Sequence, residues 1–226
     1  MNNILVIAAH PDDEILGCGG TLAKHVFNGD IVNTVIFGEG VTSREKVNNQ
    51  HEKLNKIKIE AEEANKIIGV KNLYFEELPD NQLDQFNRLK IVKIIEKYIL
   101  ELNPNIIFTH HVGDVNIDHQ VLHHSVITAT RPMPGNMVEK ILFFETPSST
   151  EWQIKDSGPA FIPNYFVDIN TTFKSKLEAL KVYDMEMRDW PHPRSLKNIE
   201  ILAKWRGSMV GLYLAEAFVL GREIKK

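Results

Sequence analysis

The sequence lacks the features that mark secreted, membrane-spanning and nucleic-acid-binding proteins. Its 226 residues include one cysteine, Cys18, so no disulfide can form within the chain and nothing points to an oxidising compartment. The net charge of -4 comes without the basic stripe that holds a phosphate backbone. The apolar run at the N-terminus has no basic leader and continues directly into acidic residues, unlike a signal peptide. We therefore expect a cytoplasmic protein with a small-molecule substrate, no nucleic-acid partner and no membrane span.

Length and composition indicate one domain. With 43% hydrophobic and 25% charged residues, the chain has the make-up of a soluble globular protein, and its length fits one α/β domain. No linker, repeat or low-complexity tract divides it. We expect residues 1–226 to form a single domain, and the sequence leaves open whether that domain forms a homo-oligomer.

Apolar runs alternate with helical patterns along the chain. The runs are unbroken, as in strands buried on both faces of a parallel sheet, and the stretches between them carry apolar residues at helical spacing. The expected strands are residues 4–9, 31–37, 72–75, 105–109 and 141–144; the expected helices are residues 20–28, 52–68, 89–102, 172–183 and 195–206. This alternation predicts a Rossmann-like, doubly wound α/β sheet, mostly parallel, with ligands beyond the carboxyl ends of its strands.

Two later segments have other patterns. Residues 147–163 are rich in serine, threonine, glycine and proline, which predicts a long loop covering the site. Residues 212–220 form an apolar stretch that fits either a helix or a strand.

A histidine and three acids follow the first expected strand. His10 and Asp13 stand three residues apart in a tight turn, so an imidazole nitrogen and a carboxylate can converge on one cation, while Asp12 points elsewhere. The alternative is that the acids cap the following helix, where carboxylates favour the positive end of the helix dipole. The residues of this segment alone favour neither reading.

A second cluster follows the fourth expected strand, where five of the nine histidines lie between residues 110 and 124. A helix starting near Asp118 places His119 and His123 on one face, four residues apart as in a zinc pair, and turns His124 away. Spacing alone does not choose among these histidines, and a solvated histidine patch is the alternative. Two such clusters at the ends of different parallel strands together favour a metal site.

These segments resemble a known family. Residues 9–14 (AHPDDE) and 17–21 (GCGGT) resemble the opening signature of the LmbE-like, or PIG-L, deacetylases, and the later Asp-His pair extends the likeness over most of the chain. The resemblance implies an enzyme that removes the acetyl group from an N-acetyl amino sugar with one zinc ion per chain, at a site that also accepts other divalent ions. It implies three zinc ligands and a catalytic base: His10, Asp13 and His119, with Asp12 as the base.

The second motif departs from the family pattern. Many members have His-Pro-Asp-His, and this chain has Asn116 at the first of those histidines. An amide can donate to a developing oxyanion but cannot deliver a proton to a leaving amine. His111 and His192 are the candidate substitutes, His111 first because it lies nearer the same loop. Asp118 is expected to accept a hydrogen bond from a histidine and fix its orientation, or to cap the helix.

Three arginines and His192 are the candidate substrate contacts, since arginine binds phosphate bidentately and these residues lie in loops or at helix ends: Arg44, Arg131, Arg194 and His192. Each is also compatible with an ordinary surface position. They favour an N-acetyl sugar within a larger glycoconjugate or a nucleotide-linked sugar. The glycines of residues 17–20 do not match a dinucleotide-binding loop and are expected to let the backbone approach the metal closely.

Two other functional classes remain. One is another metal-dependent hydrolase, a phosphoesterase or an amidase; the other is a sugar- or metal-binding module without catalysis. A two-metal phosphoesterase needs further carboxylates to bridge ions about 3.5–4 Å apart. A binding module has no need of Asp12 beside the metal.

Overall fold

Strands and helices alternate in the computed structural model, which describes residues 1–40, 50–135 and 137–225. The strands are β1 (Asn3–Ala8), β2 (Ile31–Gly38), β3 (Asn72–Leu78), β4 (Ile106–His110), β5 (Lys140–Phe144), β6 (Tyr165–Asp168) and β7 (Ala215–Glu223). The helices are α1 (Asp13–Phe27), α2 (Gln50–Ile68), α3 (Arg88–Leu102), α4 (Ile117–Ala129), α5 (Phe173–Val182) and α6 (Leu196–Ser208), with short 3-10 helices η1 (Leu83–Gln85) and η2 (Thr150–Trp152). The ten expected strands and helices are all present.

The described strands form one sheet in the order β3-β2-β1-β4-β5-β7-β6. The pairs β1–β2, β2–β3, β1–β4 and β4–β5 are parallel, whereas β7 runs antiparallel to both β5 and β6. The predicted α/β class is therefore confirmed, with a mixed sheet. The apolar stretch at residues 212–220, whose pattern fitted either a helix or a strand, contributes to strand β7. Strand β6 is not predicted from the sequence, because this edge strand has only four residues and is only half-buried.

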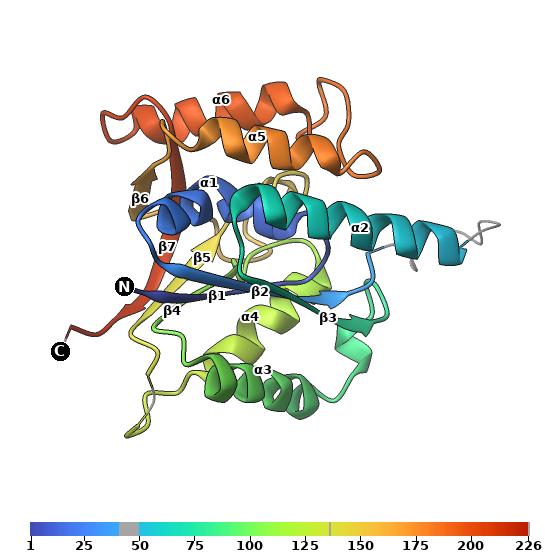
Figure 1. Cartoon of the computed structure of the whole chain (residues 1–226), viewed down its shortest axis with the longest axis vertical. Helices are drawn as coiled ribbons and strands as arrows, with labels where there is room; N and C mark the ends of the chain where they lie inside the picture. Colours follow the sequence, from blue (N-terminus) through green and yellow to red (C-terminus); the bar gives the residue numbers. More distant parts are fainter. Residues whose placement is uncertain (41–49, 136, 226) are drawn as a thin grey trace.

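The chain adds strands first on one side of β1 and then on the other. Strands β2 and β3 extend the sheet on one side of β1, and the chain then returns so that β4 lies on the other side. Helices α1, α2, α5 and α6 cover one face of the sheet and α3 and α4 the other (Figure 1). The connections that leave β1 and β4 therefore turn to opposite faces, and in open α/β sheets ligands bind at such a switch point.

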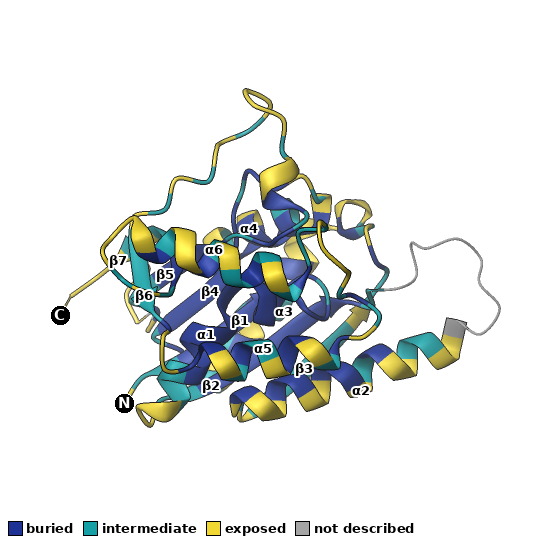
Figure 2. Cartoon of the chain, turned by 90° about the horizontal axis from the view of Figure 1, so that it is seen from above, coloured by how far each residue is buried: buried dark blue, intermediate teal, exposed yellow. Residues whose placement is uncertain are grey.

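Both faces of the sheet are buried. Along β1, Ile4 and Val6 belong to the core under α1, α2, α5 and α6, whereas Leu5 and Ile7 belong to the core against α3 and α4. The central strands are accordingly dark blue in Figure 2, while the outer faces of the helices are exposed. In the described parts of the chain, no helix combines the length and the apolar character needed to cross a bilayer.

The glycine-rich segment lies inside α1, where Gly17 and Gly20 face Phe144 and Ile169. A Cβ on Gly17 would stand 2.3 Å from the ring of Phe144, and one on Gly20 would stand 3.0 Å from Ile169. These glycines let α1 pack directly on β5 and on the segment after β6. Glycine costs about 1 kcal/mol relative to alanine in a helix. Close packing offsets that cost here, so α1 begins earlier than the predicted residue 20.

Candidate active site

The turn between β1 and α1 is held in an unusual conformation. Asp12 has φ 105°, in the left-handed region, which costs a non-glycine residue roughly 1–3 kcal/mol. Its N–H donates to Glu14 Oε2 at 3.1 Å. The other oxygen of Glu14 accepts from the Tyr183 hydroxyl at 2.6 Å and from Asn65 at 2.8 Å. The first turn of α1 thus fixes the loop, and the side chains of Asp12 and Asp13 diverge.

Three donor atoms from different elements meet beside this turn. Asp13 Oδ2 lies 3.3 Å from His10 Nδ1 and 3.2 Å from His119 Nε2, and the two nitrogens are 3.4 Å apart. A tetrahedral ion with bonds of about 2.0–2.1 Å separates its ligands by about 3.3 Å. Asp13 Oδ1 is also buried with no hydrogen-bond partner among the described residues. The residues present therefore fit a metal ion, which His10, Asp13 and His119 would hold.

The charges of this cluster favour a cation. Burial alone would lower the pKa of His119, but Asp13 and Asp114 raise it to about 9. Burial alone would raise the pKa of Asp13, but His119 and His110 hold it well below its usual value. Buried carboxylates that draw protons onto neighbouring imidazoles form a site where a divalent ion can replace those protons.

Carboxylates orient both histidines from the side away from the donor triangle. His10 Nε2 lies 3.0 Å from Asp118 Oδ2 and 3.0 Å from Asp80 Oδ1. His119 Nδ1 lies 3.1 Å from Asp114 Oδ2 in an ion pair. Such carboxylates fix the orientation of metal-binding imidazoles. Asp80 is absent from the residues predicted for the site, although it follows β3 closely, and a search for acids just after each strand finds it.

Asp12 points away from the triangle to Arg194. Arg194 Nη1 donates to Asp12 Oδ2 at 2.7 Å and to Glu186 Oε2 at 3.0 Å. Burial raises the pKa of Asp12 well above its ordinary value, although the charge of Arg194 opposes the rise. A buried carboxylate with a high proton affinity, next in sequence to a candidate metal ligand, is suited to accept a proton.

Asn116 is the N-cap of α4. Its Oδ1 accepts from the N–H of Asp118 at 2.8 Å, and its Nδ2 donates to Asn81 Oδ1 at 3.0 Å. The reading of Asp118 as the cap is therefore wrong, because a neighbour takes that position and leaves the Asp118 carboxylate for His10. The amide of Asn116 is engaged on both sides by the protein itself.

His110 ends β4 and enters the cluster, whereas the next residue, His111, does not. His110 stacks on His119 with ring centroids 3.8 Å apart, and its Nε2 accepts from the N–H of Ala9 at 2.9 Å. His111 instead donates to the carbonyl of Pro159 at 3.0 Å and contacts Phe161. Side chains alternate along a strand, so adjacent histidines face opposite sides. The placement of His111 argues against its predicted role as the proton donor.

The residues predicted to contact the substrate lie in different parts of the chain. Arg44 lies outside the described residues. Arg131 follows α4, whose 13 residues carry the chain about 20 Å away from the cluster, which argues against its predicted substrate contact. His192 lies at the rim, where its ring meets Trp152 at 5.9 Å between centroids and its Nδ1 accepts from the N–H of Arg194. The guanidinium of Arg194 is engaged with acids of the protein, which argues against a phosphate contact.

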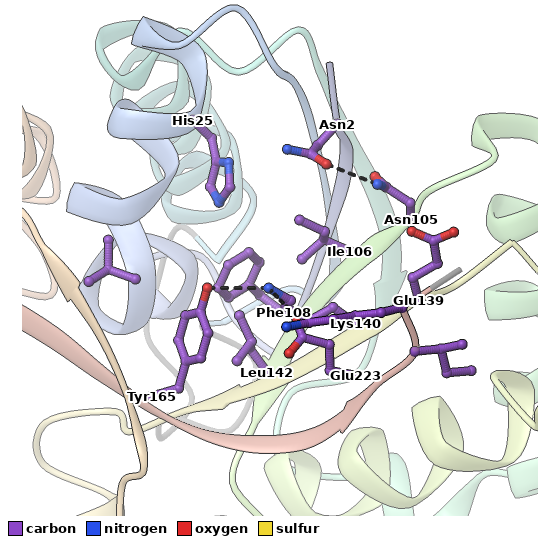
Figure 3. Close-up of a pocket in the computed structure, with 13 residues that line it drawn as sticks. Asn2, His25, Asn105, Ile106, Phe108, Glu139, Lys140, Leu142, Tyr165 and Glu223 are labelled. Atoms are coloured by element: carbon purple, nitrogen blue, oxygen red, sulfur yellow. Dashed lines mark hydrogen bonds and ion pairs between the residues drawn. The ribbon is translucent and has the colours of Figure 1, made fainter.

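A cavity of about 590 Å³ lies elsewhere, around the starts of β4 and β5 (Figure 3). Lys140 crosses it, held by Glu223 at 2.8 Å and by the Tyr165 hydroxyl at 3.3 Å. Its lining residues include none of those predicted for the site. The amino ends of the parallel strands begin here, opposite the edge where the metal-site residues gather, so this cavity is separate from the candidate site.

Comparison with known proteins agrees with the donor set. The family model described as GlcNAc-PI de-N-acetylase (PIG-L) matches residues 5–130. The "uncharacterized deacetylase YaiS" of Escherichia coli is 29% identical over 185 residues, which cover 79% of this chain and 88% of that protein. The match to the family model spans more than half of the chain and includes all three candidate metal ligands.

Two solved structures share the fold. The N,N'-diacetylchitobiose deacetylase of Pyrococcus horikoshii has a TM-score of 0.77 and 23% identity, covering 97% of this chain and 83% of that chain. The 4-carboxy-2-hydroxymuconate hydratase GalB of Pseudomonas putida has a TM-score of 0.79 and 20% identity, covering 100% and 98%. One fold thus carries two reactions, and the choice between them comes from the sequence family and the site. On that evidence, the chain belongs to the PIG-L family of metal-dependent N-deacetylases.

Proposed function

We propose that this protein is a zinc-dependent hydrolase that removes the acetyl group from an N-acetyl amino sugar. The observation that carries the proposal is the triangle of donor atoms 3.2–3.4 Å apart with a separate buried acid, Asp12, beside it. Two imidazoles and one carboxylate, from His10, His119 and Asp13, are ligands that zinc accepts at catalytic sites. A zinc ion bound there would lower the pKa of a water molecule and polarise the acetyl carbonyl.

Asp12 moves the proton in this proposal. It takes a proton from the water that attacks the acetyl carbon, and the bond between that carbon and the amide nitrogen then breaks. The leaving nitrogen needs a proton, and Asn116 cannot supply one because an amide does not ionise at neutral pH. Asp12 therefore returns the same proton to the amine. The products are acetate and the free amino sugar, and the carboxylate is restored.

The surrounding acids keep the imidazoles in place. Asp118 and Asp80 hold Nε2 of His10, so that Nδ1 faces the donor triangle. Asp114 lies behind His119 and is fixed in turn by the hydroxyl groups of Ser149 and Thr150. Residues of the long loop after β5 thereby support the metal site.

For the substrate, we propose an N-acetylglucosamine unit joined to a larger group, either a glycoconjugate or a nucleotide. The description of the family and the chitobiose deacetylase support the amino sugar. Trp152 is half exposed and meets His192 near Arg194, and an indole there provides a surface on which a sugar ring can stack. Arg44 is the remaining candidate for a phosphate contact.

An acetate-release screen tests this function. Zinc-loaded protein is incubated with free N-acetylglucosamine, diacetylchitobiose and uridine diphosphate N-acetylglucosamine, and phosphate release from sugar phosphates is measured in parallel. We expect acetate from at least one N-acetyl sugar. His119→Ala should lose both zinc and turnover, while the control His124→Ala, at an exposed position on the same helix, should keep both. Phosphate release without acetate would favour a phosphoesterase, and no turnover by zinc-loaded protein would favour a binding module.

A further inference from the structure

Arg194 connects the candidate base to the segments around the site. It lies between α5 and α6, and Nη1 donates to Asp12 Oδ2 at 2.7 Å. Nε donates to Ser148 Oγ at 2.7 Å, on the long loop after β5. We propose that Arg194 is a positioning residue that holds the Asp12 carboxylate out of the metal's coordination sphere. This inference rests on the proposed function for the identity of the metal ligands.

Asp12 is chemically able to bind the metal. Its carboxylate is 1% exposed, and its backbone adjoins that of Asp13, which belongs to the donor triangle. A buried carboxylate without a partner is costly, so in the absence of Arg194 the nearest cation is the metal ion. A fourth protein ligand would take the position that water needs, because catalytic zinc sites keep three protein ligands and structural sites have four. The partner of Asp12 therefore decides which kind of site forms.

The guanidinium is held firmly enough to compete for Asp12. Glu186, which is 4% exposed, accepts from the same Nη1 at 3.0 Å. The backbone N–H of Arg194 donates to His192 Nδ1 at 3.0 Å, which fixes the loop behind the side chain. Charge-assisted hydrogen bonds of this kind are about twice as strong as neutral ones. Arg194 is thus anchored by groups other than Asp12. The position of its guanidinium therefore fixes the position of the Asp12 carboxylate.

The geometry also explains why this position needs an arginine. The guanidinium reaches Asp12 and Glu186 through one nitrogen and Ser148 through another, in a fixed planar arrangement. A lysine offers a single charged nitrogen, so Arg194→Lys should preserve the charge opposite Asp12 but lose the contact with Ser148. The lysine variant therefore separates the effect of charge from that of the anchor.

Cobalt substitution tests the proposal without any substrate. Cobalt(II) in place of zinc absorbs visible light, and the position and shape of its bands change when a carboxylate replaces a water ligand. Spectra and cobalt dissociation constants are compared for wild type, Arg194→Ala, Arg194→Lys and the double variant Arg194→Ala with Asp12→Asn. Arg188→Ala is the matched control, because Arg188 lies in the same loop, is exposed and donates to the carbonyls of Met185 and Met187.

We expect the bands of cobalt-loaded Arg194→Ala to differ from those of wild type, and the variant to hold cobalt about tenfold more tightly, equivalent to ~1.4 kcal/mol. The double variant should return to the wild-type spectrum because a neutral amide is a poor ligand, and Arg194→Lys and Arg188→Ala should stay near wild type. An unchanged spectrum in Arg194→Ala, or a change that persists in the double variant, overturns the proposal. If Arg194→Ala fails to fold, Arg194→Ala combined with Glu186→Gln removes the buried charge left behind and permits the same comparison.

Turnover supplies a second readout. On an acetylated substrate, Arg194→Ala should lower kcat and leave KM nearly unchanged, because Asp12 no longer accepts the proton. A raised KM with unchanged kcat would assign Arg194 to substrate binding and overturn the positioning role. Failure to find any deacetylase substrate would count against the proposed function, while the cobalt spectra would still decide the role of Arg194.

Discussion

His123 is a buried histidine whose effect on stability can be worked out from its surroundings. It is 5% exposed, its Nδ1 donates to the carbonyl of His110 at 2.9 Å, and its ring packs on Phe143 with centroids 4.3 Å apart. Burial lowers the pKa of His123 to about 4, although the hydrogen bond to His110 opposes the shift. The folded protein therefore favours the neutral ring.

The sign and size of the pH effect follow from the two pKa values. The unfolded pKa is about 6.5. The stability that the neutral ring contributes is fully present above that value and is lost as the pH falls towards 4. At pH 5.5 the unfolded ring is mostly protonated and the folded ring is not. The linked loss between pH 7.5 and 5.5 is therefore about 1.4 kcal/mol, and it reaches about 3 kcal/mol below pH 4.

The variant His123→Asn tests this value, since an amide can donate to the carbonyl of His110 but does not titrate. The free energy of unfolding is measured by urea denaturation at pH 7.5 and 5.5 with a chelator present. Wild type should lose about 1.4 kcal/mol more than His123→Asn between the two pH values. His124→Asn, at an exposed position on the same helix, should behave as wild type. Equal pH dependence in wild type and His123→Asn would refute the reasoning.

Further predictions concern the site and the loop over it. Asp12→Asn should keep its zinc by elemental analysis but turn over about 10²–10⁴-fold more slowly, and near-normal turnover would contradict its role as base. Asp114→Asn removes the charge behind His119 and should weaken metal binding about 10–100-fold in a competitive titration; unchanged affinity would show that the ion pair does not orient the ring. Gly113→Ala places a Cβ 1.7 Å from the carbonyl oxygen of Pro159, so the loop must shift. We expect a loss of about 1–3 kcal/mol of stability in thermal unfolding, and an unchanged Tm would contradict the close approach.

Local sequence patterns predicted the elements of the fold because buried strands and amphipathic helices carry their own periodicity. The run before His10 became β1, and the stretch after residue 116 became α4. The same reasoning failed at the start of α1, which it placed at residue 20 although the helix begins at Asp13. Gly17 lowers the local helix propensity, but its missing side chain lets α1 pack on the ring of Phe144. Helix propensity is a weak preference that tertiary packing overrides.

The residues of the candidate site also divide into those that the sequence predicted and those that it did not. The sequence predicted that His10, Asp12 and Asp13 lie close together, because they share one short turn. The family resemblance added His119. Of the acids behind the imidazoles, Asp118 was predicted to orient a histidine, and Asp114 lies in the same segment as His119. Asp80 could not be predicted, since it reaches His10 only through the order of strands around β1. That order decides which loops lie side by side, and no local pattern encodes it.

The sequence by itself therefore determined the alternation of strands and helices, the turn that carries the first acids, and the family. Tertiary structure alone decided that Arg194 holds Asp12 across 182 residues and that His111 contacts the loop at Pro159 instead of the donor triangle. The physical reason is that the hydrophobic periodicity of a segment and the capping role of a residue depend on neighbours within about one helical turn. Its charge partner depends on where the chain returns after crossing the sheet.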